Sequence, residues 1–358
     1  MRLFDSFPFD GELDLLEFRL RENFDLIDHF ILVEAGETYR GAPKPFAFAE
    51  NQARFDWARG KIRHVALASL ARGPATPRDR AAVQRNAAML ALDDAAAGDV
   101  VLLLDVDEVP SRSLLERLRS DGLDRPRRLA MTRHHGFADM LAPRSPCCPT
   151  GADPFPAAAP WLKPGRWEAP GDCWLGHSGV AAPAQALKSQ SAFDLRYGLP
   201  LGEPIPEAGR HYSAVDPSAS LGRKLVRAFH EEYDGPRERS PDHLERCRRY
   251  RVHHRGWWYA ERPEGPLPAD VARLIAAAPA TAAPGEGSKL ERRLVRSWAW
   301  LRLWRGLPDR GVAAVDRNFE RWRPLLALPL LVADSGRSAA AGLLRLVGRR
   351  GPARSHGH

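Results

Sequence analysis

The first half of the chain alternates between two hydrophobic patterns, one typical of helices and one typical of buried strands. Residues 13–24 carry leucines at helical spacing, and the apolar run 30–33 follows as a short buried strand. Residues 62–67 are a second strand candidate, and the Ala-rich, Pro-free segment 79–97 favours a helix. Strand, helix and strand in succession predict an α/β fold with a mostly parallel central sheet.

A further apolar run, residues 100–104, ends in an acidic segment with Asp105, Asp107 and Glu108. Such a run predicts a strand buried on both faces, which delivers its last residues to the crevice where ligands bind. Asp105 and Asp107 are two apart, so on an extended chain their carboxylates project from one face and can share a hard cation bound to phosphate. The alternative is that the acids only solvate a turn, while Ser111 caps the next helix.

The second half of the sequence loses this alternation. Residues 142–170 are rich in proline and predict an ordered loop or lid, and residues 221–233 favour a helix. A Pro/Ala/Gly linker is expected over 263–287. We therefore predict a main domain over 1–262, followed by the linker and a basic, Trp/Arg/Leu-rich, mainly helical extension over 288–358.

Charge is unevenly distributed along the 358 residues, whose 44% hydrophobic content is that of a globular protein. Residues 285–358 contain 15 Lys and Arg against 6 Asp and Glu, which leaves 38 against 39 for residues 1–284. The formal net charge of +8 therefore comes from the tail. Because a nucleic-acid enzyme would carry its basic surface around its site, this distribution argues against a nucleic acid as substrate or partner.

The cysteines and the tail bear on localisation. The four cysteines form no Cys-x-x-Cys pair and no secretory leader is recognisable, so we expect a cytoplasmic protein. Leucines and tryptophans of residues 290–301 form an apolar stripe with arginines opposite, which suits an anionic membrane surface, and we expect peripheral attachment at the inner membrane face through 288–350. The alternative is that this helix packs on the main domain. The run 325–333 is broken by Pro329 and is too short to span a membrane.

Several blocks of the sequence occur in an order that matches a known family. The blocks are residues 4–9, 12–20, 30–35, Thr38 with Gly41 and residues 43–45, residues 84–86, 105–110, and 209–213 before Lys224. In these blocks the chain resembles glycosyltransferase family 17, the β-1,4-mannosyl-glycoprotein N-acetylglucosaminyltransferase family, and its Ala, Arg and Pro usage indicates a bacterial member. The resemblance implies a GT-A-like nucleotide-sugar fold, inverting transfer of N-acetylglucosamine from a UDP-sugar donor, and a divalent metal, manganese or magnesium.

The acidic segment then acquires a role in sugar transfer. A metal held by Asp105 and Asp107 would neutralise the departing diphosphate as a Lewis acid. His211, in a block shared with the family, could complete the metal site or contact the diphosphate; alone it would more often be structural. Glu108 points to the other face and could orient a ligand or a sugar hydroxyl.

Donor contacts are expected from five other residues. Glu34 ends the first predicted strand and could bind the base or ribose, unless it is an ordinary strand-end acid. Lys44 lies between two prolines that stiffen its loop, which favours a phosphate contact over a solvated surface lysine. Arg80 and Gln84 are four apart on one helical face, with Arg85 adjacent, and an arginine fork suits phosphate. Their alternative is a solvent-facing helix surface.

An inverting displacement also needs a general base on the acceptor side, expected to be a carboxylate. Asp139, Glu203, Glu207 and Asp216 are candidates, and Glu207 is preferred because it lies close to His211 in the sequence.

The chain departs from the family pattern where the acceptor would be recognised. The Trp and Glu expected ahead of Gln84 are absent from residues 76–80, and Arg210 stands where Trp is expected. Because a cytoplasmic bacterial enzyme would not meet the N-glycans of glycoproteins, we expect a glycan or lipid-linked glycan acceptor. Two other classes stay open: a haloacid-dehalogenase-like phosphatase with Asp105 as nucleophile and Asp107 as acid/base, although no Asp-Asp pair follows, and a non-catalytic glycan-binding protein.

Overall fold

A computed structural model describes residues 1–141, 179–198, 201–215 and 265–283, together with the single residues Gly222, Lys224, Arg227, Leu244, Arg248 and Arg262. The chain divides into the units Met1–Pro284 and Gly285–His358, and every described residue belongs to the first. The proline-rich segment 142–170 and the extension 288–358 therefore lie outside the described residues, as does most of the helix predicted over 221–233.

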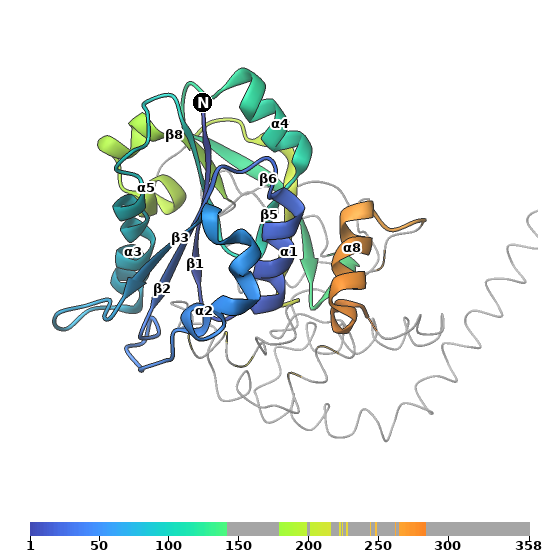
Figure 1. Cartoon of the computed structure of the whole chain (residues 1–358), viewed down its shortest axis with the longest axis horizontal. Helices are drawn as coiled ribbons and strands as arrows, with labels where there is room; N and C mark the ends of the chain where they lie inside the picture. The colour runs from blue at the N-terminus through green and yellow to red at the C-terminus, as the bar shows by residue number, and fades with distance from the viewer. Residues whose placement is uncertain are drawn as a thin grey trace, which may run out of the picture. The chain divides into compact units, whose positions relative to one another are not determined.

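Four parallel strands form the first part of the sheet, in the order β3-β2-β1-β4 (Figure 1). Residue pairing aligns Phe9 with Glu34 and Ser6 with Leu103, so all four strands end at the same edge. The strands are β1 (Leu3–Phe9), β2 (His29–Ala35), β3 (Ile62–Leu67) and β4 (Val100–Leu103). The parallel α/β pattern predicted from the sequence is confirmed for this part of the chain.

The rest of the nine-stranded sheet is mixed within the described ranges. Beyond β4 the order continues β8-β6-β9-β5, with β7 paired to β6; only the β6–β9 pair in this part is parallel. These strands are β5 (Glu108–Pro110), β6 (Arg127–His135), β7 (Phe137–Leu141), β8 (Val180–Pro183) and β9 (Ile205–Ser213). Antiparallel pairing enters this part of the sheet in part because β6 and β7 follow each other as a hairpin around Gly136, without the helical crossover that parallel neighbours need.

Helices cover both faces of the parallel strands (Figure 1). One face packs against α1 (Leu13–Asn23), α2 (Ala47–Glu50), the 3₁₀ helix η1 (Gln52–Lys61) and α4 (Arg112–Asp121). The other face packs against η2 (Ala87–Ala91), η3 (Ala184–Lys188) and α5 (Ala192–Tyr197), beside α3 (Pro77–Asn86). Alternate strand residues such as Phe7 and Phe4 enter these two apolar layers.

The helix predicted over 79–97 is shorter and begins earlier. Thr76 forms a capping box with Asp79: its hydroxyl accepts from the Asp79 amide at 3.1 Å, and the Asp79 carboxylate accepts from the Thr76 amide at 2.9 Å. With Pro77 in the first turn, these contacts start α3 at residue 77. The helix tightens into η2 after Asn86 and ends at Ala91.

The predicted linker 263–287 contains a packed helix. In α8 (Ala269–Ala277), Val271 and Leu274 are buried in a cluster with β5 and β7 residues, and the short helix η5 (Pro279–Thr281) follows. The Ala283 amide donates to Asp139 on β7 at 2.9 Å. This Ala- and Pro-rich segment therefore folds onto the main domain, because Val271 and Leu274, at helical spacing, are buried against it.

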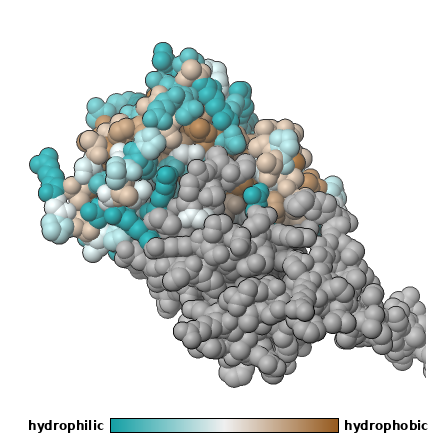
Figure 2. All heavy atoms as spheres, turned by 90° about the horizontal axis from the view of Figure 1, so that it is seen from below, coloured by the Kyte–Doolittle hydropathy of each residue, from teal (hydrophilic) through white to brown (hydrophobic). Residues whose placement is uncertain are grey.

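The described surface offers little continuous apolar area. Large apolar side chains that are exposed are Met1, Trp57, Val83 and Leu90, which lie on different elements. In the view of Figure 2, hydrophilic and hydrophobic residues are interspersed over the coloured part. In the described part of the chain, no helix has the length and apolar content of a membrane span.

Candidate active site

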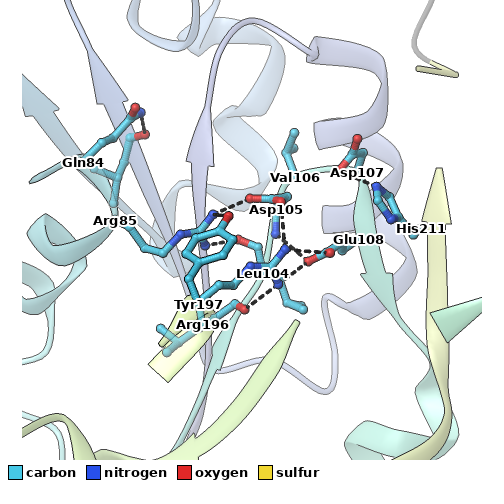
Figure 3. Close-up of polar contacts among 12 residues, drawn as sticks. Gln84, Arg85, Leu104, Asp105, Val106, Asp107, Glu108, Arg196, Tyr197 and His211 are labelled. Carbon is cyan, nitrogen blue, oxygen red and sulfur yellow. Dashed lines mark hydrogen bonds and ion pairs between the residues drawn. The ribbon is translucent and has the colours of Figure 1, made fainter. Parts of the chain in front are cut away.

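The acidic segment after β4 forms a tight turn at the carboxyl edge of the parallel strands. The Glu108 amide donates to the Asp105 carbonyl at 3.0 Å, which reverses the chain before β5 begins. The sequence predicts that the two aspartates project from one face of an extended chain, and this is wrong. Asp105 points toward Arg85 and Arg196, whereas Asp107 points toward His211 (Figure 3). We call residues 105–108 the acidic turn.

A buried arginine of α1 holds the backbone of the acidic turn. Arg19 binds Asp5 of β1 through two contacts of 2.7 and 2.5 Å, and both side chains are fully buried. Its remaining nitrogen, Nη1, donates to the carbonyls of Asp105, Val106 and Glu108 at 2.8, 3.1 and 2.5 Å. Because one guanidinium satisfies three turn carbonyls, the position of the turn is fixed to the central strand and to α1.

Two further arginines bind the carboxylates on one side of the turn. Arg196 of α5 contacts Glu108 through two bonds of 2.8 Å and reaches Asp105 Oδ2 at 2.9 Å. Arg85 of α3 contacts Asp105 Oδ1 at 2.5 Å and the Leu104 carbonyl at 3.0 Å. Burial alone would raise the pKa of Asp105, but Arg196 and Arg85 outweigh it and hold the pKa well below its usual value. We call Asp105, Glu108, Arg85 and Arg196 the arginine cluster.

Different partners surround Asp107. Its Oδ2 lies 2.5 Å from Lys224 Nζ, and its Oδ1 lies 3.6 Å from His211 Nε2. The Asp107 side chain is 4% exposed, whereas that of Lys224 is 41% exposed. Burial would raise the pKa of Asp107, but the Lys224 ammonium and His211 outweigh it and hold the pKa far below its usual value. We call Asp107, Lys224 and His211 the lysine cluster.

Close packing of β9 on β5 brings His211 to the turn. Glu108 pairs with His211 in the strand register, and the Tyr212 amide donates to the Asp107 carbonyl at 2.7 Å. Gly209 has a φ of +149°, and a Cβ there would lie 2.2 Å from the Val109 carbonyl oxygen. Only glycine permits the two strands to approach this closely, so β9 requires glycine at position 209.

A second group of charges lies where β1 ends. Asp10 contacts Lys44 Nζ at 3.2 Å and Arg227 Nη1 at 3.4 Å. The Glu12 carboxylate accepts from the Asp10 amide at 3.0 Å. Burial, with the negative charge of Asp10, raises the pKa of Glu12 to about 7, and the Lys224 charge acts in the opposite direction. Lys44 thus reaches the same sheet edge as the acidic turn, through Asp10.

Three of the predicted donor residues have other partners. Glu34 is fully buried, where it accepts from the Phe48 amide at 3.0 Å and contacts His64 at 3.1 Å. Gln84 donates to the Val33 carbonyl at 2.8 Å and points away from the turn (Figure 3). Arg80 donates to the Ala75 carbonyl at 2.5 Å. These contacts fit roles in holding β2, α3 and the neighbouring loop; of this predicted group, Arg85 contacts the acidic turn directly and Lys44 reaches its edge.

Three of the four candidate bases lie in the described part of the chain, and none of them has a contact with the acidic turn there. Glu207 is exposed and lies four residues along β9 from His211. Its φ is +51°, so the backbone is not fully extended there and the span to His211 is at most about 13 Å. It lies beside Ser111, whose hydroxyl donates to the Glu207 carbonyl at 2.9 Å. Glu203 is exposed at the same end of β9, before the strand begins. Asp139 is buried and paired with Arg262. Glu207 is close to His211 in the sequence, but it lies toward the other end of β9. Asp216 lies outside the described residues.

The contacts of the acidic turn do not fit a divalent metal held by Asp105, Asp107 and His211. Both Asp105 oxygens bind arginines, and Asp107 Oδ2 binds an ammonium group. Across the described ranges, no three His, Cys, Asp or Glu side chains are grouped so that they could hold a metal. The carboxylates are arranged for cationic side chains.

Sequence reasoning missed the cations that organise this site. Arg19 lies in a leucine-rich helix and reaches the turn across 86 residues of sequence, and Arg196 reaches it across 91. For Arg19 a signal existed, since it belongs to the helical face that carries Leu16 and Leu20, where an arginine must be paired when buried. Lys224 follows a block shared with the family, and nothing in its local sequence indicates its contact with Asp107.

Comparison with known proteins supports one enzyme class. Residues 1–135 match the family model of glycosyltransferase family 17, a range that includes β1 to β5, the acidic turn and α4. Among curated proteins, none matches the chain. Two solved structures, of galactosyltransferase LgtC with donor and acceptor sugar analogs and of an active-site mutant of LgtC, are 12% and 13% identical to this chain. Each alignment covers 80% of this chain and 98% of that protein with a TM-score of 0.30, at which a shared fold is not established.

The phosphatase alternative fits the geometry poorly, because the Asp105 oxygens that would attack phosphorus are bound by Arg85 and Arg196.

The match over residues 1–135 supports the glycosyltransferase family, and the protein is a glycosyltransferase.

Proposed function

We propose that the protein transfers a sugar from a UDP-sugar to a glycan or lipid-linked glycan, at the carboxyl edge of β1 and β4. One observation carries the proposal: the acidic turn lies at this edge and is surrounded by the cations Arg85, Arg196 and Lys224. In open α/β sheets, ligands bind outside the carboxyl ends of the strands, and cations there suit a diphosphate.

The donor is a nucleoside diphosphate sugar, bound with its diphosphate toward the lysine cluster. Lys224 contributes an ammonium with a 41% exposed side chain, and Lys44 and Arg227 lie at the end of β1. We propose UDP-N-acetylglucosamine as the donor and a GT-A-like arrangement of the sheet, and the match of residues 1–135 to glycosyltransferase family 17 supports this choice.

Transfer proceeds by a single displacement with inversion. The acceptor hydroxyl attacks the anomeric carbon, the bond from that carbon to the diphosphate oxygen breaks, and UDP departs while the hydroxyl proton passes to a base. The arginine cluster fixes the turn during this step, because its buried ion pairs leave the Asp105 and Glu108 carboxylates few alternative positions. The acceptor is a glycan assembled in the cytoplasm, with the extension 288–350 on an anionic membrane surface.

A donor panel tests this function. Full-length protein is mixed with UDP-sugars, once with excess EDTA and once with Mn²⁺, and binding is followed by the shift in melting temperature. We expect one UDP-sugar to stabilise the protein more than the others, and that donor to release UDP in the presence of a glycan acceptor. Asp107→Asn should lower the turnover by about 100-fold, since it removes the charge that positions Lys224.

The matched control is Lys188→Ala, which removes an exposed cation on η3, beside the start of β4. It should bind and turn over the donor as the wild type does. Absence of any nucleotide-sugar response, with and without Mn²⁺, would contradict the proposed function.

A further inference from the structure

We propose that Lys224 takes the place of a divalent cation at the acidic turn and holds the donor diphosphate, so that donor binding does not depend on a metal. This inference rests on the proposed function, because it concerns how the same site binds the leaving group. It differs from the metal site that the Asp-x-Asp spacing and the family resemblance led us to expect.

Asp107 already binds an ammonium group. Its carboxylate is 4% exposed, and Lys224 Nζ lies 2.5 Å from Oδ2. A metal on Asp107 would sit about 2.0–2.6 Å from a carboxylate oxygen, where it would meet the ammonium as a like charge at contact distance. A dication could bind Asp107 in this geometry only if Lys224 moved away.

Asp105, the other ligand of the expected metal site, binds two arginines. Arg85 takes Oδ1 at 2.5 Å and Arg196 takes Oδ2 at 2.9 Å. Arg196 is 2% exposed and also binds both oxygens of Glu108 at 2.8 Å. The Asp105 side chain is 37% exposed, but freeing it for a metal would leave two buried guanidinium groups without this carboxylate, and the loss of a partner by a buried charge is strongly unfavourable.

Lys224 has hydrogen-bond donors to offer to a ligand. An ammonium group has three donors, and the contact with Asp107 uses one of them. The side chain of Lys224 is 41% exposed, and Arg227, three residues later, reaches Asp10 at 3.4 Å. Asp107 thus anchors a positive charge at the open side of the turn, where a phosphate oxygen can accept from it.

Calorimetric titration of the full-length protein with UDP tests the inference. The wild type is titrated in excess EDTA and again with saturating Mn²⁺, and we expect the two dissociation constants to agree within about twofold. Lys224→Ala in EDTA should weaken UDP binding by about 10- to 100-fold, the usual range for one charge-assisted hydrogen bond. Mn²⁺ should restore part of the affinity of this variant only, because removal of the ammonium frees the Asp107 carboxylate.

Two control variants complete the design. Lys188→Ala should bind UDP as the wild type does, and Lys224→Arg, which keeps the charge, should lose less affinity than Lys224→Ala. Circular dichroism melting establishes that each variant is folded, and the wild-type comparison of EDTA with Mn²⁺ needs no variant.

The outcomes separate the inference from the proposed function. UDP binding by the wild type that requires Mn²⁺ would overturn the inference and leave the proposed function standing. Wild-type affinity of Lys224→Ala in EDTA would also overturn it. Failure of UDP to bind the wild type under both conditions would instead contradict the proposed function.

Discussion

The acidic turn has two halves that use the same residue type in different ways. In the arginine cluster, Asp105 is 37% exposed, but the cations that hold it, Arg85 and Arg196, are buried, and so is Glu108. In the lysine cluster, Asp107 is buried but its partner Lys224 is 41% exposed. One half therefore fixes the backbone of the site, and the other presents a charge to a ligand.

This difference shows why an Asp-x-Asp spacing is a weak guide to a metal site. The spacing is compatible with shared chelation on an extended chain, but the bond between the Glu108 amide and the Asp105 carbonyl turns the two side chains apart. What each carboxylate does is then decided by cations that are distant in the sequence: Arg85 of α3, Arg196 of α5 and Lys224.

The largest expected effect breaks the arginine cluster. Arg196→Met leaves the buried Glu108 and the Asp105 carboxylate without this partner and should lower the free energy of unfolding by about 3–5 kcal/mol in urea titrations. Lys224→Met should cost less, about 1–2 kcal/mol, because the lysine itself is partly exposed and Asp107 keeps His211. Equal losses in the two variants would mean that the two halves do not differ as described.

A smaller loss of stability is expected at Gly209 of β9, where the close approach of β5 and the positive φ both favour glycine. Gly209→Ala places a Cβ against the Val109 carbonyl and should cost about 2 kcal/mol of unfolding free energy, while it displaces His211 from Asp107. Gly202→Ala is the matched control, since Gly202 also has a positive φ, +71°, but no atom lies within 4 Å of its Cβ position. If both variants lose the same stability, the close packing of β9 on β5 is not what requires glycine.

Glu12, in the group of charges beside the lysine cluster, predicts a dependence of stability on pH. Glu12 has its folded-state pKa raised from 4.5 to about 7, so between these values the folded protein binds more protons than the unfolded chain. This contribution to stability is therefore complete below pH 4.5 and is lost as the pH rises through 7. Melting temperatures across this window should fall less steeply for Glu12→Gln than for the wild type, and parallel curves would contradict the raised pKa.

The smallest expected effect concerns the base preferred from the sequence. Glu207→Gln should leave donor turnover within about twofold of the wild type, because this exposed side chain lies four residues along β9 from His211, beside Ser111 and not beside the acidic turn. General bases typically contribute about 100-fold or more, so a loss of that size, measured as UDP release, would return Glu207 to the site.

Much of the parallel half could be predicted from the sequence because its signals are local. β3 has the predicted bounds, α1 and β4 each end one residue early, and Ser111 caps α4 by accepting from the Leu114 amide at 3.3 Å. β1 was missed as a strand, although it is central, because Pro8 and the polar pair Asp5 and Ser6 hide its pattern. The burial of Asp5 is possible only through Arg19.

The site could be predicted only in part, for a related reason. The acidic turn, Arg85 and His211 were found from motifs, and the structure brings all of them together. Glu34 and Gln84 were also found from family blocks, but those blocks include residues that hold strands and helices in place. Ion pairs between distant segments, such as Arg196 with Glu108, leave no pattern in a single sequence.

The most direct test of the central claim is a crystal structure of the full-length protein with UDP. The account predicts the diphosphate at the carboxyl edge of β1 and β4, with a phosphate oxygen about 3 Å from Lys224 Nζ and the arginine cluster unchanged. UDP bound away from the acidic turn, or a metal seated between Asp105 and Asp107 with Arg85 and Arg196 displaced, would contradict it.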